Sequence, residues 1–163
     1  MDQILSNRKF KVVLNGKESH FKYLQNGLSQ GSVLAPTLFN IYTADIVHTA
    51  ARKFTYADDI ALVAQDKMVT TIERILNDDL ANMQAYFDKW YLTLNLNKTV
   101  SIFLHLNNRD AQKKLDLRIG NHSIVNEEYP RYLGVKIDRS LTYKQHLEGV
   151  KNKIKTRNNI IAK

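Results

Sequence analysis

Two adjacent aspartates, Asp58 and Asp59, stand between two short apolar runs in the segment FTYADDIALV, residues 54–63. Asp is common at turns because its side chain bonds its own backbone, and a turn role alone would account for the pair. Two neighbouring carboxylates nevertheless repel each other unless a cation compensates them. Carboxylate oxygens at a rigid hairpin tip suit Mg²⁺, and two such ions about 4 Å apart assist phosphoryl transfer. The pair is therefore a candidate metal site as well as a candidate turn.

A second candidate for chemistry is the segment GLSQG, residues 27–31, which fits the G-x-S-x-G pattern of a serine hydrolase. Asp138 and His146 follow Ser29 in the chain order of a hydrolase triad. A nucleophile elbow requires a helix directly after the serine, whereas the residues VLA intervene here before Pro36. The hydrolase hypothesis therefore ranks behind one in which the chain acts on phosphates.

The charge balance points to a polyanionic partner. Lys and Arg number 24 against 16 Asp and Glu, a net charge of +8. Nucleic acid is the first candidate for such a chain, and a basic surface that only keeps the protein soluble is the alternative. The 163 residues contain no cysteine, no apolar run near the ~20 residues of a membrane span and no signal-peptide pattern. We therefore expect an intracellular protein, nuclear or cytoplasmic, without a membrane partner.

Several elements are predicted around the aspartates. Asn15-Gly16 predicts a two-residue turn in a hairpin over residues 10–24. Pro36 and the spacing of the apolar residues after it predict a helix over 36–50. The apolar runs on either side of Asp58-Asp59 predict a second hairpin.

The second half of the chain predicts one long helix followed by strands and a basic helix. A capping box of Thr70 and Glu73 would begin the long helix. Residues 100–106 predict a strand with a buried face of Val100, Ile102, Leu104 and Leu106. The segments 117–125 and 132–137 predict a hairpin turning at Gly120-Asn121 and a further strand, and the chain turns helical and basic from Ser140. The apolar stripe expected to form the core face of the long helix comprises Met68, Ile72, Leu76, Leu80, Met83, Phe87 and Trp90. This order favours an α+β fold with an antiparallel sheet over a parallel doubly wound sheet.

Four motifs in this order resemble the reverse transcriptases of non-LTR retrotransposons, close to the jockey-like LINE group. YADD is similar to their YxDD box, and NGLSQGSVLAPTLFNIYTADI to the palm motif that precedes it. LNLNKTVSIF is similar to the next motif, and YLGVKIDRSLTYKQHLEGVKNKI to the primer-grip strand and the first thumb helix. The resemblance implies a right-hand polymerase palm over residues 1–138 and the start of a thumb helix over 139–163. It also implies an RNA template, a DNA primer, deoxynucleoside triphosphates and two Mg²⁺ ions.

The resemblance implies a role for each matching position. Asp58 and Asp59 would bind metal, with Asp58 favoured as the direct ligand. Tyr56, Gln30 and Gly31 would lie near the nucleotide and template. Lys98 would be catalytic, because it would meet the phosphates and protonate the pyrophosphate leaving group. Two of these positions have plain alternatives, since Tyr56 fits a core aromatic and Lys98 a solvated lysine. The predicted primer grip comprises Tyr132, Leu133 and Gly134, and the predicted contacts to the nucleic-acid backbone are Lys151, Lys153, Lys155 and Arg157.

Two departures from the family pattern bear on activity. Ser29 occupies the usual proline of the P-Q-G box, which leaves that loop less rigid. Nothing in the first ten residues, MDQILSNRKF, matches the motif that carries the family's first metal-binding aspartate. We therefore expect a polymerase fragment that is inactive alone. The alternatives are a non-enzymatic nucleic-acid-binding remnant and, more distantly, a serine hydrolase.

Overall fold

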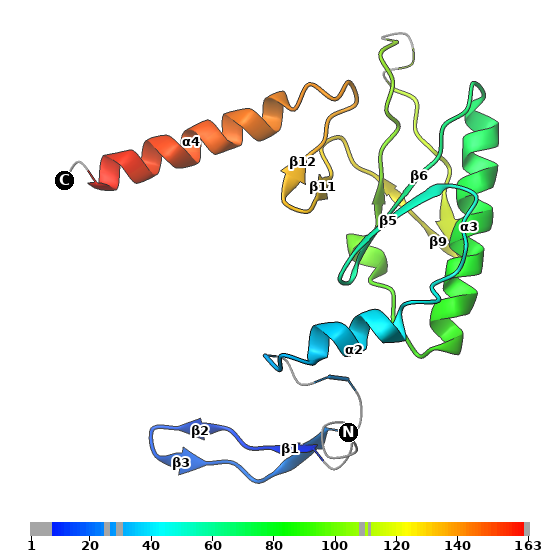
Figure 1. Ribbon diagram of the computed structural model, residues 1–163. Coiled ribbons are helices and arrows are strands. Elements are labelled where there is room, and N and C mark those ends of the chain that lie inside the picture. Colours follow the sequence, from blue (N-terminus) through cyan, green and yellow to red (C-terminus); the bar gives the residue numbers. More distant parts are fainter. Residues whose placement is uncertain (1–7, 25–26, 29–30, 108–109, 111, 162–163) are drawn as a thin grey trace. The chain divides into compact units, whose positions relative to one another are not determined.

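The computed structural model describes residues 8–24, 27–28, 31–107, 110 and 112–161 (Figure 1). The chain divides into two compact units, Met1–Asp45 and Ile46–Lys163. Each unit combines antiparallel hairpins with helix, so the predicted mixture of α and β structure is confirmed. The assignment of this structure to palm and thumb, with a division at residues 138 and 139, stays a prediction.

The first unit contains the hairpin predicted around Asn15-Gly16. Both turn residues have positive φ angles, 50° and 75°, as a type I′ turn requires. Phe10 pairs with Lys22 but Val13 pairs with Glu18, so one additional residue on the returning strand forms a β-bulge. The strands are β1 (Arg8–Phe10), β2 (Val13–Leu14), β3 (Lys17–Glu18) and β4 (Lys22–Leu24).

Helix α2 (Ala35–Tyr42) begins as predicted but ends eight residues before the predicted end at residue 50. Pro36 lies in its first turn, where the missing N–H costs nothing. At the other end, Thr43 Oγ1 donates to the Phe39 carbonyl at 3.0 Å. In the second unit, the backbone of residues 46–51 forms hydrogen bonds with the side chains of Lys53 and Asp79 and not with a helical backbone. The prediction of a helix over 36–50 is therefore wrong beyond Tyr42.

The second unit begins with the hairpin that carries the two aspartates. Strands β5 (Arg52–Tyr56) and β6 (Asp59–Val63) pair antiparallel, with Arg52 opposite Val63 and Tyr56 opposite Asp59. The turn between them is Ala57-Asp58, so the predicted hairpin is confirmed. In Figure 1, β5 and β6 lie beside the long helix α3.

Helix α3 (Val69–Lys89) provides one wall of the core. Four of the seven predicted core residues, Ile72, Leu76, Met83 and Phe87, are buried. Met68 is 61% exposed and precedes the helix, so its prediction as a core residue is wrong. Strand β8 packs against α3. Every second residue from Leu115 to Ile119 is buried, which is the period of a strand. The central cluster comprises Ala51, Ile72, Leu76, Leu115, Leu117, Ile119 and Ile124.

The capping box predicted for α3 is absent. The N-cap is Met68, and no side chain caps it. Glu73 Oε1 instead accepts the Asp116 N–H at 2.8 Å, a long-range bond that removes it from the helix terminus. Glu73, which the sequence pattern predicts as a capping residue, therefore accepts a tertiary hydrogen bond instead.

The strand predicted over residues 100–106 is much shorter than expected. Strand β7 (Val100–Ser101) pairs in parallel with β10 (Val125–Asn126), and the backbone of His105 then bonds to Arg139 at 3.0 Å. The predicted buried face is also wrong, because Leu104 and Leu106 are 39% and 80% exposed. The hairpin of β8 (Arg118–Ile119) and β9 (His122–Ser123) turns at Gly120-Asn121 as predicted.

The segment predicted as a single strand around Tyr132 is a hairpin. Strands β11 (Arg131–Tyr132) and β12 (Val135–Lys136) pair through a turn in which Leu133 and Gly134 have φ angles of 48° and 82°. Two positive φ angles define a type I′ turn, and the glycine makes it accessible. The basic helix predicted from Ser140 is confirmed as α4 (Lys144–Ile161). Among the described residues, no helix has both the length and the apolar character needed to cross a membrane.

Candidate active site

The two aspartates lie at the exposed tip of the β5–β6 hairpin. Asp58 is the second turn residue and Asp59 is the first residue of β6. Ala57 has a positive φ of 51° and Asp58 has a negative φ, as at the first and second central positions of a type II′ turn. Both aspartates are exposed. Two hard oxygen donors open to solvent fit a Mg²⁺ ion that keeps several water or phosphate ligands.

The described residues do not form a complete metal cage around this tip. Among the described residues, no group of three or more His, Cys, Asp or Glu side chains is close enough to hold a metal ion. Two carboxylates supply only part of the ligand set that a pair of ions needs. The donor set therefore fits metal binding but not two fully protein-bound ions.

Two charged side chains hold the chain that leads into β5. Lys53 Nζ donates to the carbonyls of Ile46 and Val47 at 2.9 and 2.6 Å. Burial lowers the pKa of Lys53, and the charge of Asp79 opposes that shift. The lysine thus bonds the carbonyl groups that would have continued α2.

Asp79 is buried on the core face of α3, with 3% of its surface exposed. Its carboxylate accepts the N–H groups of Ala50 and Ala51 at 2.9 and 2.8 Å. Sequence reasoning missed this residue. The signal was available, because Asp79 lies three residues after Leu76 and four before Met83, inside the apolar stripe.

The β11–β12 hairpin meets the β5–β6 hairpin. The Tyr132 hydroxyl donates to the Phe54 carbonyl at 3.5 Å, which joins the predicted primer-grip segment to the strand that leads to the aspartates. Leu133, at the tip of its own hairpin, is 47% exposed, and Gly134 has open space where a side chain would stand. Tyr56 is 66% exposed, so its interpretation as a core aromatic is wrong for this unit.

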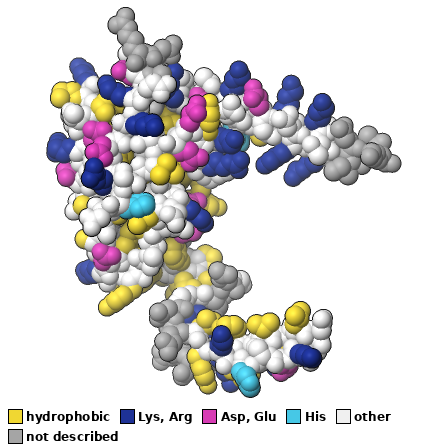
Figure 2. Space-filling model, turned by 180° about the vertical axis from the view of Figure 1, so that it is seen from behind, with side chains coloured by type: hydrophobic (Ala, Val, Ile, Leu, Met, Phe, Trp, Pro, Cys, Tyr) yellow, Lys and Arg dark blue, Asp and Glu magenta, His cyan; other side chains and the backbone are white. Residues whose placement is uncertain are grey.

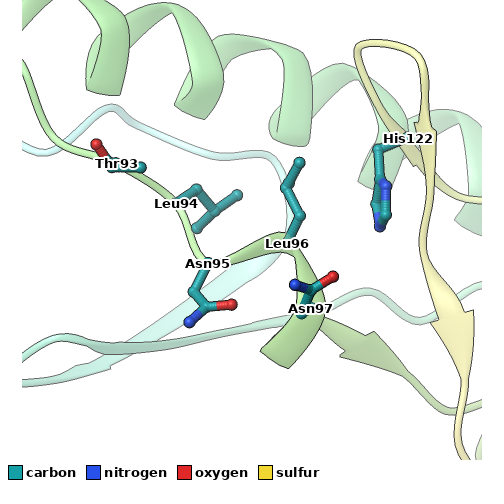
Figure 3. Close-up of a pocket in the computed structure, with 6 residues that line it drawn as sticks. All are labelled: Thr93, Leu94, Asn95, Leu96, Asn97 and His122. Atoms are coloured by element: carbon teal, nitrogen blue, oxygen red, sulfur yellow. The ribbon is translucent and has the colours of Figure 1, made fainter.

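Lys98 is exposed at the end of the short helix η1 (Leu96–Lys98). In the described part of the chain, no hydrogen bond or ion pair joins its side chain to Asp58 or Asp59. A shallow pocket adjoins this segment (Figure 3). It contains none of the predicted site residues, and its lining is Thr93, Leu94, Asn95, Leu96, Asn97 and His122.

The predicted template loop is only partly described. Gln30 lies outside the described residues. Gly31 belongs to the first unit and has a φ of 84° with open space around it, a conformation that suits glycine. Its role near the template stays a prediction.

The predicted contacts to nucleic acid form an exposed group on α4. We call Lys151, Lys153, Lys155 and Arg157 the basic α4 group; all four are exposed. Figure 2 shows Lys and Arg side chains projecting from both sides of this helix. Their charges are free to meet a polyanion.

The structure does not support the serine-hydrolase hypothesis, because Asp138 and His146 bond to other groups and Ser29 lies outside the described residues. Ser29 is not among the described residues, and α2 begins only at Ala35. The Asp138 carboxylate accepts the N–H groups of Ser140, Thr142 and Tyr143. His146 Nδ1 accepts the Lys136 N–H at 3.4 Å instead of facing Asp138. This arrangement gives no support to a triad.

The comparisons with known proteins indicate the same family as the sequence motifs. A family model described as reverse transcriptase (RNA-dependent DNA polymerase) matches residues 1–137. The RNA-directed DNA polymerase from the mobile element jockey of Drosophila funebris is 31% identical over 159 residues, which is 92% of this chain and 17% of that protein. Its Drosophila melanogaster counterpart is 28% identical over 163 residues, or 94% of this chain and 17% of that protein.

A further relative is the probable RNA-directed DNA polymerase from transposon BS of Drosophila melanogaster, 29% identical over 153 residues, 88% of this chain and 17% of that protein. The chain thus spans about a sixth of the length of these curated relatives, 17% in each case. No solved structure matches it. The predicted resemblance is confirmed, and the chain belongs to the reverse transcriptase family, among the polymerases of non-LTR retrotransposons.

Proposed function

We propose that this chain contributes the YADD metal site and the adjoining primer-grip hairpin to an RNA-directed DNA polymerase that acts inside the cell. The observation that carries the proposal is the exposed pair Asp58 and Asp59 at the tip of the β5–β6 hairpin. A hydrogen bond from Tyr132 to β5 connects this hairpin to the β11–β12 hairpin. A primer 3′-hydroxyl would attack the α-phosphate of a deoxynucleoside triphosphate, and pyrophosphate would leave. When bound, two Mg²⁺ ions would favour loss of the hydroxyl proton and stabilise the charge on the leaving oxygen.

The residues of the chain have separate parts in this proposal. Asp58 and Asp59 hold the metal, and Tyr132, Leu133 and Gly134 support the primer end beside it. Tyr56, Gln30 and Gly31 line the nucleotide and template, and Lys98 meets the phosphates. The roles of Gln30, Gly31 and Lys98 rest on the motif match alone. In this proposal residues 1–138 belong to the palm and 139–163 to the thumb.

A metal titration tests the core of the proposal. Mn²⁺ added to the isotope-labelled chain should broaden the amide resonances around the β5–β6 turn, because a paramagnetic ion held there relaxes nearby nuclei. Asp58→Asn should remove most of this broadening, whereas Asp88→Asn, an exposed carboxylate on α3, should leave it unchanged. Broadening that ignores Asp58→Asn would place the metal elsewhere and contradict the proposal.

We also expect the 163-residue chain to show no templated primer extension by itself. Two carboxylates form part of the ligand set, and among the described residues no third acidic or imidazole ligand joins them. Positioning of the reactants alone can supply roughly 7–11 kcal/mol of the barrier reduction, and the chain offers no closed nucleotide pocket among its described residues. Extension that disappears in Asp58→Ala would show instead that the chain is a complete catalyst.

A non-enzymatic nucleic-acid binder is the second candidate function. The exposed basic α4 group favours it, because phosphate attraction needs only charge. This function is compatible with the first, since a polymerase must also bind its template. A chain that binds nucleic acid but shows no Mn²⁺ broadening at Asp58 would favour the binder alone.

A further inference from the structure

Arg139 lies in the short segment between β12 and α4 and bonds to a distant part of the second unit. Its Nη1 atom donates to the carbonyls of His105 and Asn107 at 3.3 and 3.2 Å, 34 and 32 positions earlier in the chain. The same atom lies 3.4 Å from Nδ1 of the His105 ring. The backbone adds a bond in which the His105 N–H donates to the Arg139 carbonyl at 3.0 Å. We call this set of bonds the Arg139 clamp.

One side of the Arg139 clamp is attached to the core. Phe103 packs against the central cluster of buried residues. The ring of His105 lies against the ring of Phe103, with 4.7 Å between their centroids, a separation at which aromatic rings are in contact. A continuous path of contacts therefore leads from the core through residues 103–107 to Arg139.

The other side of the clamp is attached to α4. Asp138 directly precedes Arg139, and its carboxylate accepts the N–H groups of Ser140, Thr142 and Tyr143 in the turn that begins the helix. Of these two consecutive residues, one bonds to the start of α4 and the other to the segment that packs on the core. The path of the chain into α4 is thus fixed at residues 138 and 139.

Helix α4 has a second attachment to the same unit. The Lys136 N–H of β12 donates to His146 Nδ1 in the first turns of the helix, at 3.4 Å. A helix attached at one point can pivot about it, whereas a second attachment restricts its direction. Loss of the Arg139 clamp would therefore leave α4 attached mainly through β12.

We propose that Arg139 is a positioning residue that fixes the direction of α4 and so presents the basic α4 group to nucleic acid. The second half of this inference rests on the proposed function, in which that group contacts the nucleic-acid backbone. An arginine suits the task because its guanidinium remains charged and its several N–H groups can bond more than one carbonyl. A helix already held in position binds a duplex without giving up the freedom of a loose joint, so its binding is stronger.

Spin labels measure the position of α4 directly. The chain contains no cysteine, so Ala85→Cys on α3 and Asn152→Cys on α4, both exposed positions, would carry the only two labels. Pulsed electron paramagnetic resonance then gives the distribution of distances between the two helices. We expect a narrow distribution with Arg139 in place and a broader one in Arg139→Gln. Equal widths in the two chains would overturn the proposal.

Two further variants separate position from charge. Arg118→Gln removes the same charge from an exposed arginine that pairs with Asp116, and it should leave the distribution narrow. Arg139→Lys keeps a cationic donor at the clamp, and one ammonium can replace in part the bonds that now leave a single guanidinium nitrogen. We therefore expect a width between those of the wild-type chain and Arg139→Gln. Broadening by Arg118→Gln as large as that by Arg139→Gln would assign the effect to net charge and overturn the proposal.

The core should stay folded when the clamp is lost. Trp90, the single tryptophan, ends α3, and its fluorescence reports on that helix and the core beside it. Arg139→Gln should leave the emission of Trp90 unchanged while it broadens the distance distribution. Unfolding of the whole unit in Arg139→Gln would make Arg139 a residue on which the core depends and would overturn a positioning role.

Duplex binding tests the use of the clamp. Relative to Arg118→Gln, Arg139→Gln should bind an RNA–DNA duplex about threefold to tenfold more weakly, because the freed joint must be ordered on binding. The slope of log affinity against log salt concentration should be the same in both, since the same phosphates are neutralised. A flatter slope in Arg139→Gln would show that Arg139 itself meets a phosphate and would overturn the positioning role.

Failure of the clamp and failure of the proposed function give different results. Without any duplex binding by the wild-type chain, the proposed nucleic-acid contact of α4 would be wrong, and with it the use of the clamp. An unchanged distance distribution in Arg139→Gln, with duplex binding intact, would overturn the clamp and leave the proposed function standing.

Discussion

The Asp138 carboxylate fastens the turn that leads into α4. The hydrogen bond from the Thr142 N–H contributes most to holding the pKa of Asp138 below its usual value. Desolvation opposes this effect and is the second-largest contribution, while the Thr142 hydroxyl and the N–H groups of Tyr143 and Ser140 lower the pKa further. A carboxyl with a lower pKa in the folded than in the unfolded state stabilises folding above the unfolded pKa. This contribution is lost as the pH falls through the folded pKa.

We therefore expect a ¹³C NMR titration to show that the carboxyl of Asp138 has a pKa below the ordinary value of an aspartate. In urea unfolding, the stability difference between the wild-type chain and Asp138→Asn should shrink as the pH is lowered through that range. A titration of Asp138 at or above the ordinary carboxyl value would contradict the structure.

Ala57 holds a backbone conformation that alanine seldom adopts. Its φ of 51° in the turn before Asp58 costs a non-glycine residue about 1–2 kcal/mol. Ala57→Gly should therefore raise the free energy of unfolding by up to about 1 kcal/mol, after the greater freedom of glycine in the unfolded chain is counted. Ala57→Val should lower it by about 1 kcal/mol, because a β-branched residue suits a positive φ least. Thr55→Val, on the exposed strand beside it, should change it by less than about 0.5 kcal/mol. A turn that tolerates Val as well as Gly would show that Ala57 is unstrained.

At the scale of elements, Asp79 ties α3 to the start of β5. Asp79→Ala would leave the N–H groups of Ala50 and Ala51 without their acceptor, which costs about 1–3 kcal/mol for each group that stays buried. Urea unfolding should therefore show a loss of at least about 2 kcal/mol, and amide exchange at Ala50 and Ala51 should accelerate. Asp78→Ala removes only an exposed ion pair with Arg74, worth about 0.5 kcal/mol or less. Equal losses from the two variants would contradict the role given to Asp79.

Elements with a local signal were predictable from the sequence, and those set by distant contacts were not. The turn residues Asn15-Gly16 and the apolar period of α3 fix their elements within a few neighbours along the chain. By contrast, α2 ends at Tyr42, and the backbone after it bonds to Lys53, which is six or seven positions away from its acceptors, and to Asp79, which is 28 or 29 positions away from its donors. The hairpin at Leu133-Gly134 had a signal in its glycine, but the apolar residues on either side indicated a strand.

In the candidate site, too, the local element was predictable and the long-range contact was not. The hairpin of Asp58 and Asp59 was predictable because two apolar runs flank a two-residue turn. The bond from Tyr132 to Phe54 joins residues 78 positions apart, and no local pattern indicates such a contact. The sequence therefore predicted the hairpin that carries Asp58 and Asp59 but not the contact that joins it to β11.

At the scale of the whole molecule, the proposed metal site and the proposed nucleic-acid contacts use different residues. Asp58 and Asp59 lie at one hairpin tip, whereas the net charge of +8 is carried in part by the basic α4 group. Attraction of nucleic acid should therefore depend on α4 and be independent of the metal site. This separation can be measured through the salt dependence of binding.

We expect the chain to bind RNA–DNA duplexes weakly, without sequence preference, and with an affinity that falls as salt rises. Each phosphate neutralised contributes about 0.7–0.9 to the slope of log affinity against log salt concentration. Replacing the basic α4 group with Ala should flatten that slope, whereas Asp58→Ala should leave binding unchanged or strengthen it by removing a repulsive charge. A control variant should remove four exposed lysines from elsewhere in the chain, Lys17, Lys67, Lys89 and Lys114. If the scattered and the α4 substitutions flatten the slope equally, the attraction comes from net charge and not from a surface on α4.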